Sequence, residues 1–252
     1  MRSRGNGLWL GWSGLILALV LIAGGGRAEN PTGSAAEPGL VPAGSAEAVA
    51  GSATLRDALA ADVSSEAGAD PVVDYEAAAR KKEEAFKDRL KKDPRDFEAA
   101  YGLGNLYYDL GKRDEAEASY RKALEIKPDH LAALVNLGVV LNEGNKSASA
   151  LEMFDAALKI APNDILALCN KGQALYALKR YDEAVDLYQK AITIDSKSQM
   201  AHYWLGVAFA DAGIYREAMR EWELAMAADS TSETAMTARD GINVLKQMVG
   251  ER

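Results

Sequence analysis

The chain has 252 residues, of which 26% are charged and 48% are apolar, and it carries a net charge of −8. This composition is ordinary for a folded globular protein. Residues 1–28 contain three arginines and no acidic residue, so the remaining residues carry a net charge of −11. Because this negative charge repels phosphate backbones, we do not expect nucleic acid as a partner.

The first 28 residues have the pattern of an export signal. Arg2 and Arg4 precede an apolar run from Leu8 to Ala23, and Gly24, Gly25, Gly26, Arg27 and Ala28 follow. A basic start, an apolar stretch and a small-residue cleavage point are typical of a secretory signal peptide. The alternative is an uncleaved signal anchor that attaches the chain to the inner membrane through residues 8–26, since about 20 apolar residues span a bilayer. Either signal places the later residues outside the cytoplasm, in the periplasm or beyond it.

Residues 29–72 are rich in alanine, glycine, proline and serine and contain no aromatic residue. Such a segment does not bury enough apolar surface to offset its chain entropy, so we predict a disordered linker. From residue 73 to residue 93 the pattern becomes helical, with Phe86 and Leu90 on one face and charged residues on the other. We predict that this segment is an N-terminal capping helix.

Four consecutive units then repeat with a period of 34 residues. The units are 97–130, 131–164, 165–198 and 199–232. A glycine recurs as Gly104, Gly138, Gly172 and Gly206, and an aromatic residue recurs as Tyr120, Phe154, Tyr188 and Trp222. A fixed period in this range indicates a solenoid of stacked helix–turn–helix units.

Local signals place the ends of the predicted helices. Gly111, Gly144 and Gly213 mark the turns between the two helices of the first, second and fourth units. A last helix is predicted over residues 233–249 as a C-terminal cap. Ser230 and Glu233 have the spacing of a capping box at its start.

The repeated residues resemble a known family signature. In the first unit this signature is Leu103-Gly104, Tyr107, Ala116, Tyr120, Ala123 and Pro128. The third unit departs from it, with Lys171 in place of the leucine and Ser196 in place of the proline. On these residues the chain resembles a tetratricopeptide repeat (TPR) protein over 97–232, of the bacterial envelope type when the N-terminal signal is included. The resemblance implies an all-α, right-handed superhelical solenoid that binds protein or peptide partners.

Members of this family capture peptides on a concave face, which the first helix of each unit lines. Nine residues of this chain are candidates for such a groove, on a helical face opposite the packing positions. They are Tyr101, Asn105, Tyr108, Asn136, Asn170, Gln173, Tyr176, Tyr203 and Trp204. Asparagine and glutamine amides pair with a peptide backbone, and tyrosine and tryptophan anchor its side chains. Because packing does not require amides at these positions, we predict that they contact the partner.

One subclass of the family holds a C-terminal carboxylate with two asparagines and several basic residues. Asn105 and Asn136 match its asparagine positions, whereas its basic positions fall on uncharged residues here. These are Tyr101, Leu166 and Asn170. We therefore do not expect a ligand of that kind.

The remaining reactive residue types form no catalytic or metal-binding set. Cys169 is the only cysteine, which excludes an intramolecular disulfide. The two histidines, His130 and His202, have no cysteine or acidic residue at ligand spacing, so no metal or cofactor is expected. His202 occupies a packing position and is predicted to be a half-buried core residue. The sequence thus predicts a non-enzymatic adaptor or assembly factor, and the alternative is a self-assembling structural scaffold of the cell envelope. It predicts neither the identity of the partner nor the oligomeric state.

Overall fold

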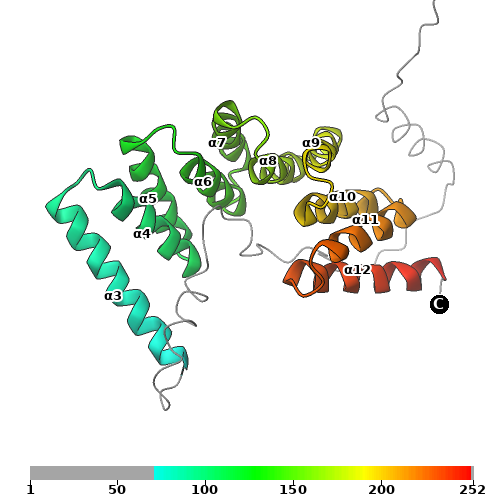
Figure 1. The fold of residues 1–252 in the computed structure, drawn as a ribbon, viewed down its shortest axis with the longest axis horizontal. Coiled ribbons are helices and arrows are strands. Elements are labelled where there is room, and N and C mark those ends of the chain that lie inside the picture. Colours follow the sequence, from blue (N-terminus) through cyan, green and yellow to red (C-terminus); the bar gives the residue numbers. More distant parts are fainter. Residues whose placement is uncertain (1–70, 251–252) are drawn as a thin grey trace, which may run out of the picture. The chain divides into compact units, whose positions relative to one another are not determined.

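The computed structural model describes residues 71–250, so the predicted signal and nearly all of the predicted linker lie outside the described residues. The described residues form ten α-helices and no β-strand (Figure 1), which confirms the predicted all-α solenoid. In chain order the helices are α3 (Pro71–Lys92), α4 (Phe97–Asp109), α5 (Arg113–Ile126), α6 (Leu131–Glu143), α7 (Ser147–Ile160), α8 (Ile165–Ala177), α9 (Tyr181–Ile194), α10 (Gln199–Asp211), α11 (Tyr215–Ala228) and α12 (Glu233–Val249). None of these helices is both long and apolar enough to cross a membrane.

The first helix of each pair begins at a side-chain cap. The capping residues accept a hydrogen bond from the backbone N–H three residues later, and they are Asp96, His130, Asp164 and Ser198. The last helix, α12, is capped in the same way by Ser232, so the predicted cap at Ser230 is wrong. The reason is a tight turn in which the Asp229 side chain accepts hydrogen bonds from Thr231, which keeps Ser230 outside the helix.

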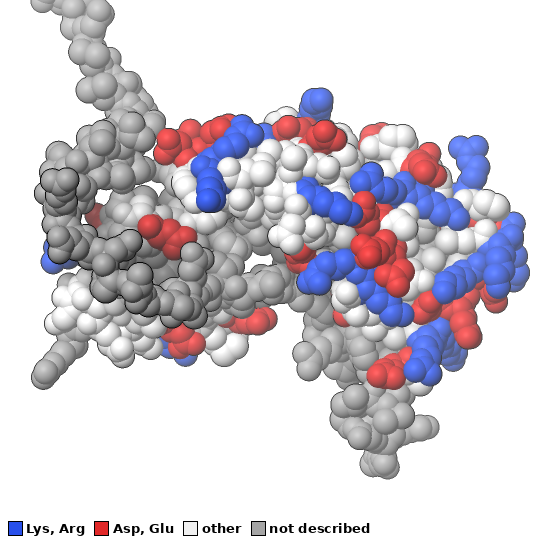
Figure 2. All heavy atoms as spheres, turned by 180° about the vertical axis from the view of Figure 1, so that it is seen from behind, with Lys and Arg blue, Asp and Glu red and all other residues white. Residues whose placement is uncertain are grey.

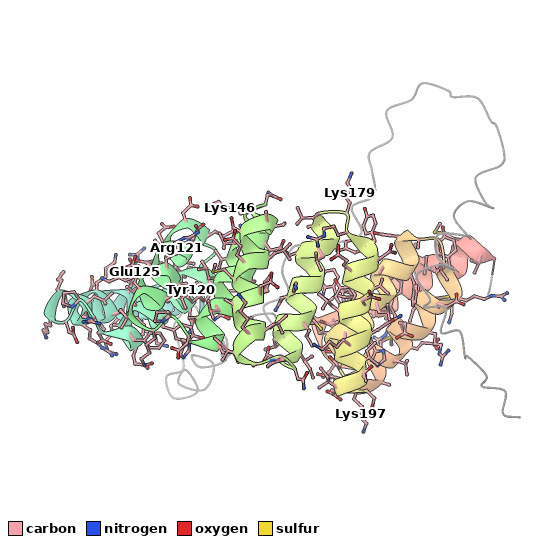
Figure 3. All side chains as sticks on the ribbon, turned by 90° about the horizontal axis from the view of Figure 1, so that it is seen from above. Tyr120, Arg121, Glu125, Lys146, Lys179 and Lys197 are labelled. Carbon is pink, nitrogen blue, oxygen red and sulfur yellow. The ribbon has the colours of Figure 1, made fainter. Side chains whose placement is uncertain are left out.

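The turn inside each pair places one residue in the left-handed conformation. These residues are Gly111, Asn145, Lys179 and Gly213, with φ of 70°, 59°, 61° and 76°. In the second pair the glycine expected at the turn, Gly144, ends α6 with a negative φ, and Asn145 takes the left-handed position instead. Figure 3 shows Lys146 and Lys179 at the edge that carries these turns, and Lys197 at the opposite edge, where one pair leads into the next.

Within each pair the recurring aromatic side chain packs on the recurring glycine. A Cβ atom added at Gly138, for example, would lie 2.5 Å from the Phe154 ring, and the other three pairs are equally tight. Phe154 and its counterparts in the other pairs are buried. The repeated residues are therefore core residues that let the two helices approach closely.

Successive pairs stack so that their first helices lie beside one another. Helix α6 contacts α8, α8 contacts α10, and α10 contacts α12. Each second helix packs against the first helix of its own pair and of the following pair (Figure 1). We use the name inner face for the side of α4, α6, α8 and α10 that points away from the second helices. This side corresponds to the groove predicted from the sequence.

The two ends of the array are covered by α3 and α12. On α3, Glu83 accepts a hydrogen bond of 3.0 Å from the Tyr107 hydroxyl of α4, and the Lys87 ammonium lies 6.0 Å from the centre of the same ring. On α12, Gly241 lies against the ring of Trp222. Phe86 of α3 also packs against Gly102 of α4, so both end helices cover apolar surface of the pair beside them.

Candidate functional site

The nine predicted groove residues all lie on α4, α6, α8 and α10, but they differ in exposure. Six are half-buried, namely Tyr101, Asn105, Tyr108, Gln173, Tyr176 and Trp204. Asn136, Asn170 and Tyr203 are buried, with 0%, 2% and 9% of their surface exposed. The inner face therefore presents a row of aromatic and amide side chains above a layer of buried polar ones.

A hydrogen-bond network holds the inner face of the first two pairs together. The Asn136 side-chain nitrogen donates to the Tyr101 hydroxyl and to Asn105 Oδ1, at 3.2 Å each. The Tyr120 hydroxyl donates to the same Asn105 oxygen at 2.8 Å. The expectation that packing does not require an amide here is thus wrong for Asn136, because the side chains of the preceding pair cover it.

Two tyrosines connect neighbouring pairs at the edge of the inner face. The Tyr108 hydroxyl on α4 donates to Glu143 Oε1 on α6 at 2.8 Å. At the equivalent position, the Tyr176 hydroxyl on α8 donates to Asp211, which ends α10. Burial, followed by the charge or hydrogen bond of the nearby carboxylate, raises the pKa of both hydroxyls, so both remain protonated donors at neutral pH.

The sequence analysis missed Glu143 and Asp211 as partners of these tyrosines. Each acid follows its tyrosine by 35 residues, one period plus one position. Residues one period apart occupy equivalent places on neighbouring first helices, so a residue 35 positions later lies next to that equivalent place. The spacing of 35 residues could therefore have indicated the contact between each tyrosine and its acid.

The third and fourth pairs form a second, less connected part of the inner face. Gln173 Nε2 donates to Asn170 Oδ1 at 3.3 Å. The rings of Tyr203 and Trp204 meet edge to face, with centroids 5.3 Å apart. The buried hydroxyl of Tyr188 has no hydrogen-bond partner among the described residues, although its counterpart in the first pair is bonded.

His202 and Cys169 lie in the core, whereas His130 is half-buried and caps the start of α6. His202 is more deeply buried than predicted, and its Nδ1 and Nε2 atoms lie 2.7 Å from Glu221 Oε2 and 3.1 Å from the Ser196 carbonyl oxygen. Cys169 is fully buried, and burial raises the pKa of its thiol to about 12. Within residues 71–250 no group of three or more histidine, cysteine or acidic side chains is placed to hold a metal ion.

Stacked helix pairs with close glycine–aromatic packing and a half-exposed inner face define a class of repeat protein that serves protein–protein interaction. The family profile described as "Tetratricopeptide repeat" matches residues 74–130 and 103–165, and the profile described as "TPR repeat" matches residues 172–213. Together these matches cover more than half of the chain. The chain therefore belongs to the tetratricopeptide repeat family.

Two solved structures with a similar fold are those of MamA and PilW. One is MamA from Desulfovibrio magneticus RS-1, with 22% identity and a TM-score of 0.55 over 62% of this chain and 88% of that chain. The other is PilW, described as a widely conserved type IV pilus biogenesis factor, with 20% identity and a TM-score of 0.57 over 72% of this chain and 93% of that chain. At these identities the likeness shows the fold. A comparison with curated protein sequences gave no match.

Proposed function

We propose that this protein is a non-enzymatic adaptor or assembly factor whose inner face binds an extended segment of a partner protein outside the cytoplasm. The observation that carries the proposal is the row of six half-exposed aromatic and amide side chains on the first helices. Side chains of these types, gathered on one accessible face, provide both anchoring area and hydrogen bonds for a peptide.

The buried and half-exposed residues take different roles in this proposal. Trp204, Tyr101 and Tyr176 anchor partner side chains, while Asn105 and Gln173 pair with its backbone. Asn136 acts from beneath by fixing the Tyr101 hydroxyl and the Asn105 amide in place. Asn170 supports Gln173 in the same way. A preorganised surface of this kind loses less side-chain entropy when the partner binds.

The proposed location rests on the N-terminal signal. Two arginines before an apolar run support export or membrane anchoring, and both outcomes place the repeats outside the cytoplasm. A structurally similar protein, PilW, is described as a pilus biogenesis factor, and this description agrees with an assembly role at the cell envelope.

A self-assembling scaffold of the cell envelope is the second candidate. The observation in its favour is the outward side of α12, where Met236 and Met248 are 51% and 62% exposed. Exposed apolar side chains on a terminal helix provide a contact for a second copy. Sedimentation velocity of the purified protein at micromolar concentration distinguishes the two candidates, because a scaffold forms oligomers and an adaptor remains a monomer.

Paired variants test the proposal. Trp204→Ala combined with Gln173→Ala removes an anchor and a backbone contact from the inner face, and Leu224→Ala removes an exposed apolar residue from α11 as the matched control. We expect the inner-face variant to bind the partner at least about 30-fold more weakly, since loss of an anchor at a hot spot costs about 2 kcal/mol or more. Equal capture of the partner by both variants, with helicity unchanged, would overturn the proposal.

A further inference from the structure

Two of the four recurring aromatic residues are tyrosines, and each of them has an amide at one position of the inner face. Tyr120 and Asn105 belong to the first pair, and Tyr188 and Gln173 occupy the same positions two periods later, in the third pair. The other two pairs have neither a hydroxyl nor an amide at these places. Their residues are Phe154 with Val139 and Trp222 with Val207. The hydroxyl and the amide thus occur together or not at all.

In the first pair the tyrosine and the amide are bonded to each other, and in the third pair they are not. The Tyr120 hydroxyl donates to Asn105 Oδ1 at 2.8 Å. The Tyr188 hydroxyl has no hydrogen-bond partner among the described residues. Gln173 Nε2 donates instead to Asn170 Oδ1 on its own helix, at 3.3 Å. This distance exceeds the usual range of about 2.7–3.2 Å for such bonds, so the bond that holds Gln173 is weak.

The Tyr188 hydroxyl is a buried donor that lies beside α8. A Cβ atom added at Gly172, the residue before Gln173, would lie 2.8 Å from Tyr188 Cζ, the ring carbon that bears the hydroxyl. Tyr188 is fully buried, and burial raises the pKa of its hydroxyl well above the ordinary value, so the hydroxyl keeps its proton. A buried donor without an acceptor is unfavourable, and an acceptor that reaches it gains a strong contact.

The contact that fixes the amide of the first pair has no counterpart in the third. Asn136 on the following first helix donates to Asn105 Oδ1 at 3.2 Å and so holds that amide from the neighbouring pair. The residue equivalent to Asn136 beside Gln173 is Trp204, whose ring meets Tyr203 edge to face. Gln173 is half-buried, and no side chain among the described residues donates to its Oε1 atom. The Gln173 amide is therefore able to turn.

We propose that Tyr188 is a positioning residue of the inner face, whose hydroxyl holds the Gln173 amide when the partner is bound. The inference rests on the proposed function, because a segment that covers the inner face excludes water from Gln173 Oε1. Without water this oxygen needs a donor, and the Tyr188 hydroxyl supplies it. Side-chain rearrangements of this size are common at interfaces.

The turned amide gives Gln173 a defined contact with the partner. While Oε1 accepts from Tyr188, Nε2 exchanges Asn170 for a main-chain carbonyl oxygen of the bound segment. Asn170 thus holds the amide in the free chain, and Tyr188 holds it in the complex. The third pair then has the bond that the first pair has already in the free chain, between Tyr120 and Asn105.

A double-mutant cycle on the full chain tests this role, because it isolates the coupling between Tyr188 and Gln173. Tyr188→Phe removes only the hydroxyl, and the buried Phe154 shows that the fold accepts phenylalanine at this position. Gln173→Met removes the amide and keeps the length of the side chain. The binding probe is the protein that a photo-crosslinking amino acid at Trp204 captures in the source cell, which is then purified and titrated against each variant.

We expect Tyr188→Phe to weaken binding of this probe by about threefold or more, the effect of one hydrogen bond. In the Gln173→Met background the same substitution should leave the affinity unchanged. The urea midpoint of the free chain should stay the same or rise with Tyr188→Phe, since the hydroxyl has no partner there. Tyr120→Phe is the matched control and should lower the midpoint, because its bond exists in the free chain.

A tyrosine that only supports the fold would not separate binding from stability in this way. An unchanged affinity of Tyr188→Phe, an equal loss of affinity in both backgrounds, or a fall of the midpoint as large as that of Tyr120→Phe would overturn the role of Tyr188. Each of these results leaves the proposed function intact. If the amino acid at Trp204 captures no protein, the proposed function fails and the role of Tyr188 fails with it.

Discussion

At the scale of single residues, the fit between glycine and aromatic ring sets how closely the helices of a pair approach. Gly138 and the fully buried Phe154 leave no room for a methyl group. Gly138→Ala should therefore lower the free energy of unfolding by about 1–3 kcal/mol, the usual cost of overpacking a core. Urea titration followed by circular dichroism measures the change. A loss of less than about 0.5 kcal/mol is the range of ordinary surface substitutions. Such a result would contradict the argument, because it would show that the two helices can move apart to accommodate the methyl group.

Lys179 holds the left-handed conformation in the turn of the third pair, with φ of 61°. A side chain with a Cβ atom pays roughly 1 kcal/mol or more in this conformation, whereas glycine adopts it without strain. Lys179→Gly should accordingly raise the free energy of unfolding by about 0.5–1 kcal/mol, after the entropy of glycine in the unfolded chain is subtracted. The matched control is Gly213→Ala in the fourth pair, where thermal unfolding should show a loss of similar size. Stabilisation by both substitutions would contradict the strain argument.

At the scale of helices, ion pairs connect neighbouring second helices of the array. Acidic and basic side chains are also interspersed over the face of the molecule that Figure 2 shows. Glu117 on α5 lies 2.8 Å from the Lys146 ammonium, which precedes α7, and 2.9 Å from Arg121 on its own helix. Figure 3 labels both basic residues. The hydrogen bond from Lys146 is the largest cause that lowers the pKa of Glu117. The bridge therefore favours the charged carboxylate in the folded state.

This lowered pKa predicts a pH dependence with a definite sign. A carboxyl whose pKa is lower in the folded state stabilises the fold above its ordinary pKa of about 4.3, and the contribution disappears as the pH falls through the lowered value. The difference in unfolding free energy between wild type and Glu117→Gln should be largest at neutral pH and vanish in acid. Urea titrations from pH 7 down to strong acid provide the measurement. Glu152→Gln is the control, since Glu152 is exposed and forms no ion pair within the described helices.

The sequence predicted features that depend on contacts within one repeat unit better than features that depend on contacts between units. The period of 34 residues and the recurring Gly104 and Tyr120 predicted the helix pairs, because the pairing depends on contacts inside one unit. The burial of Asn136 was not predictable in this way, since Tyr101 of the preceding unit covers it. The replacement at Lys171 was visible in the sequence, but its meaning required knowing that the residue contacts Asp155 of the neighbouring pair.

At the scale of the whole molecule, the N-terminal signal leads to a prediction about where the exported protein is cleaved. Gly26 and Ala28 are the small residues of the cleavage point before Glu29, so a secreted form should begin at Glu29. Mass spectrometry of the protein isolated from its source cell measures the mature N-terminus. An intact N-terminus in the membrane fraction would instead support the anchored form. A cytoplasmic protein that retains all 28 residues would contradict export.

The central claim for the whole molecule is that the inner face holds the partner. A photo-crosslinking amino acid placed at Trp204 or Tyr176 tests this contact in the source cell, and the same amino acid at Asp186, exposed on α9, is the control. We predict that both inner-face positions form an adduct with the same protein and that Asp186 forms none. Adducts formed from Asp186 while Trp204 and Tyr176 give none would contradict the claim.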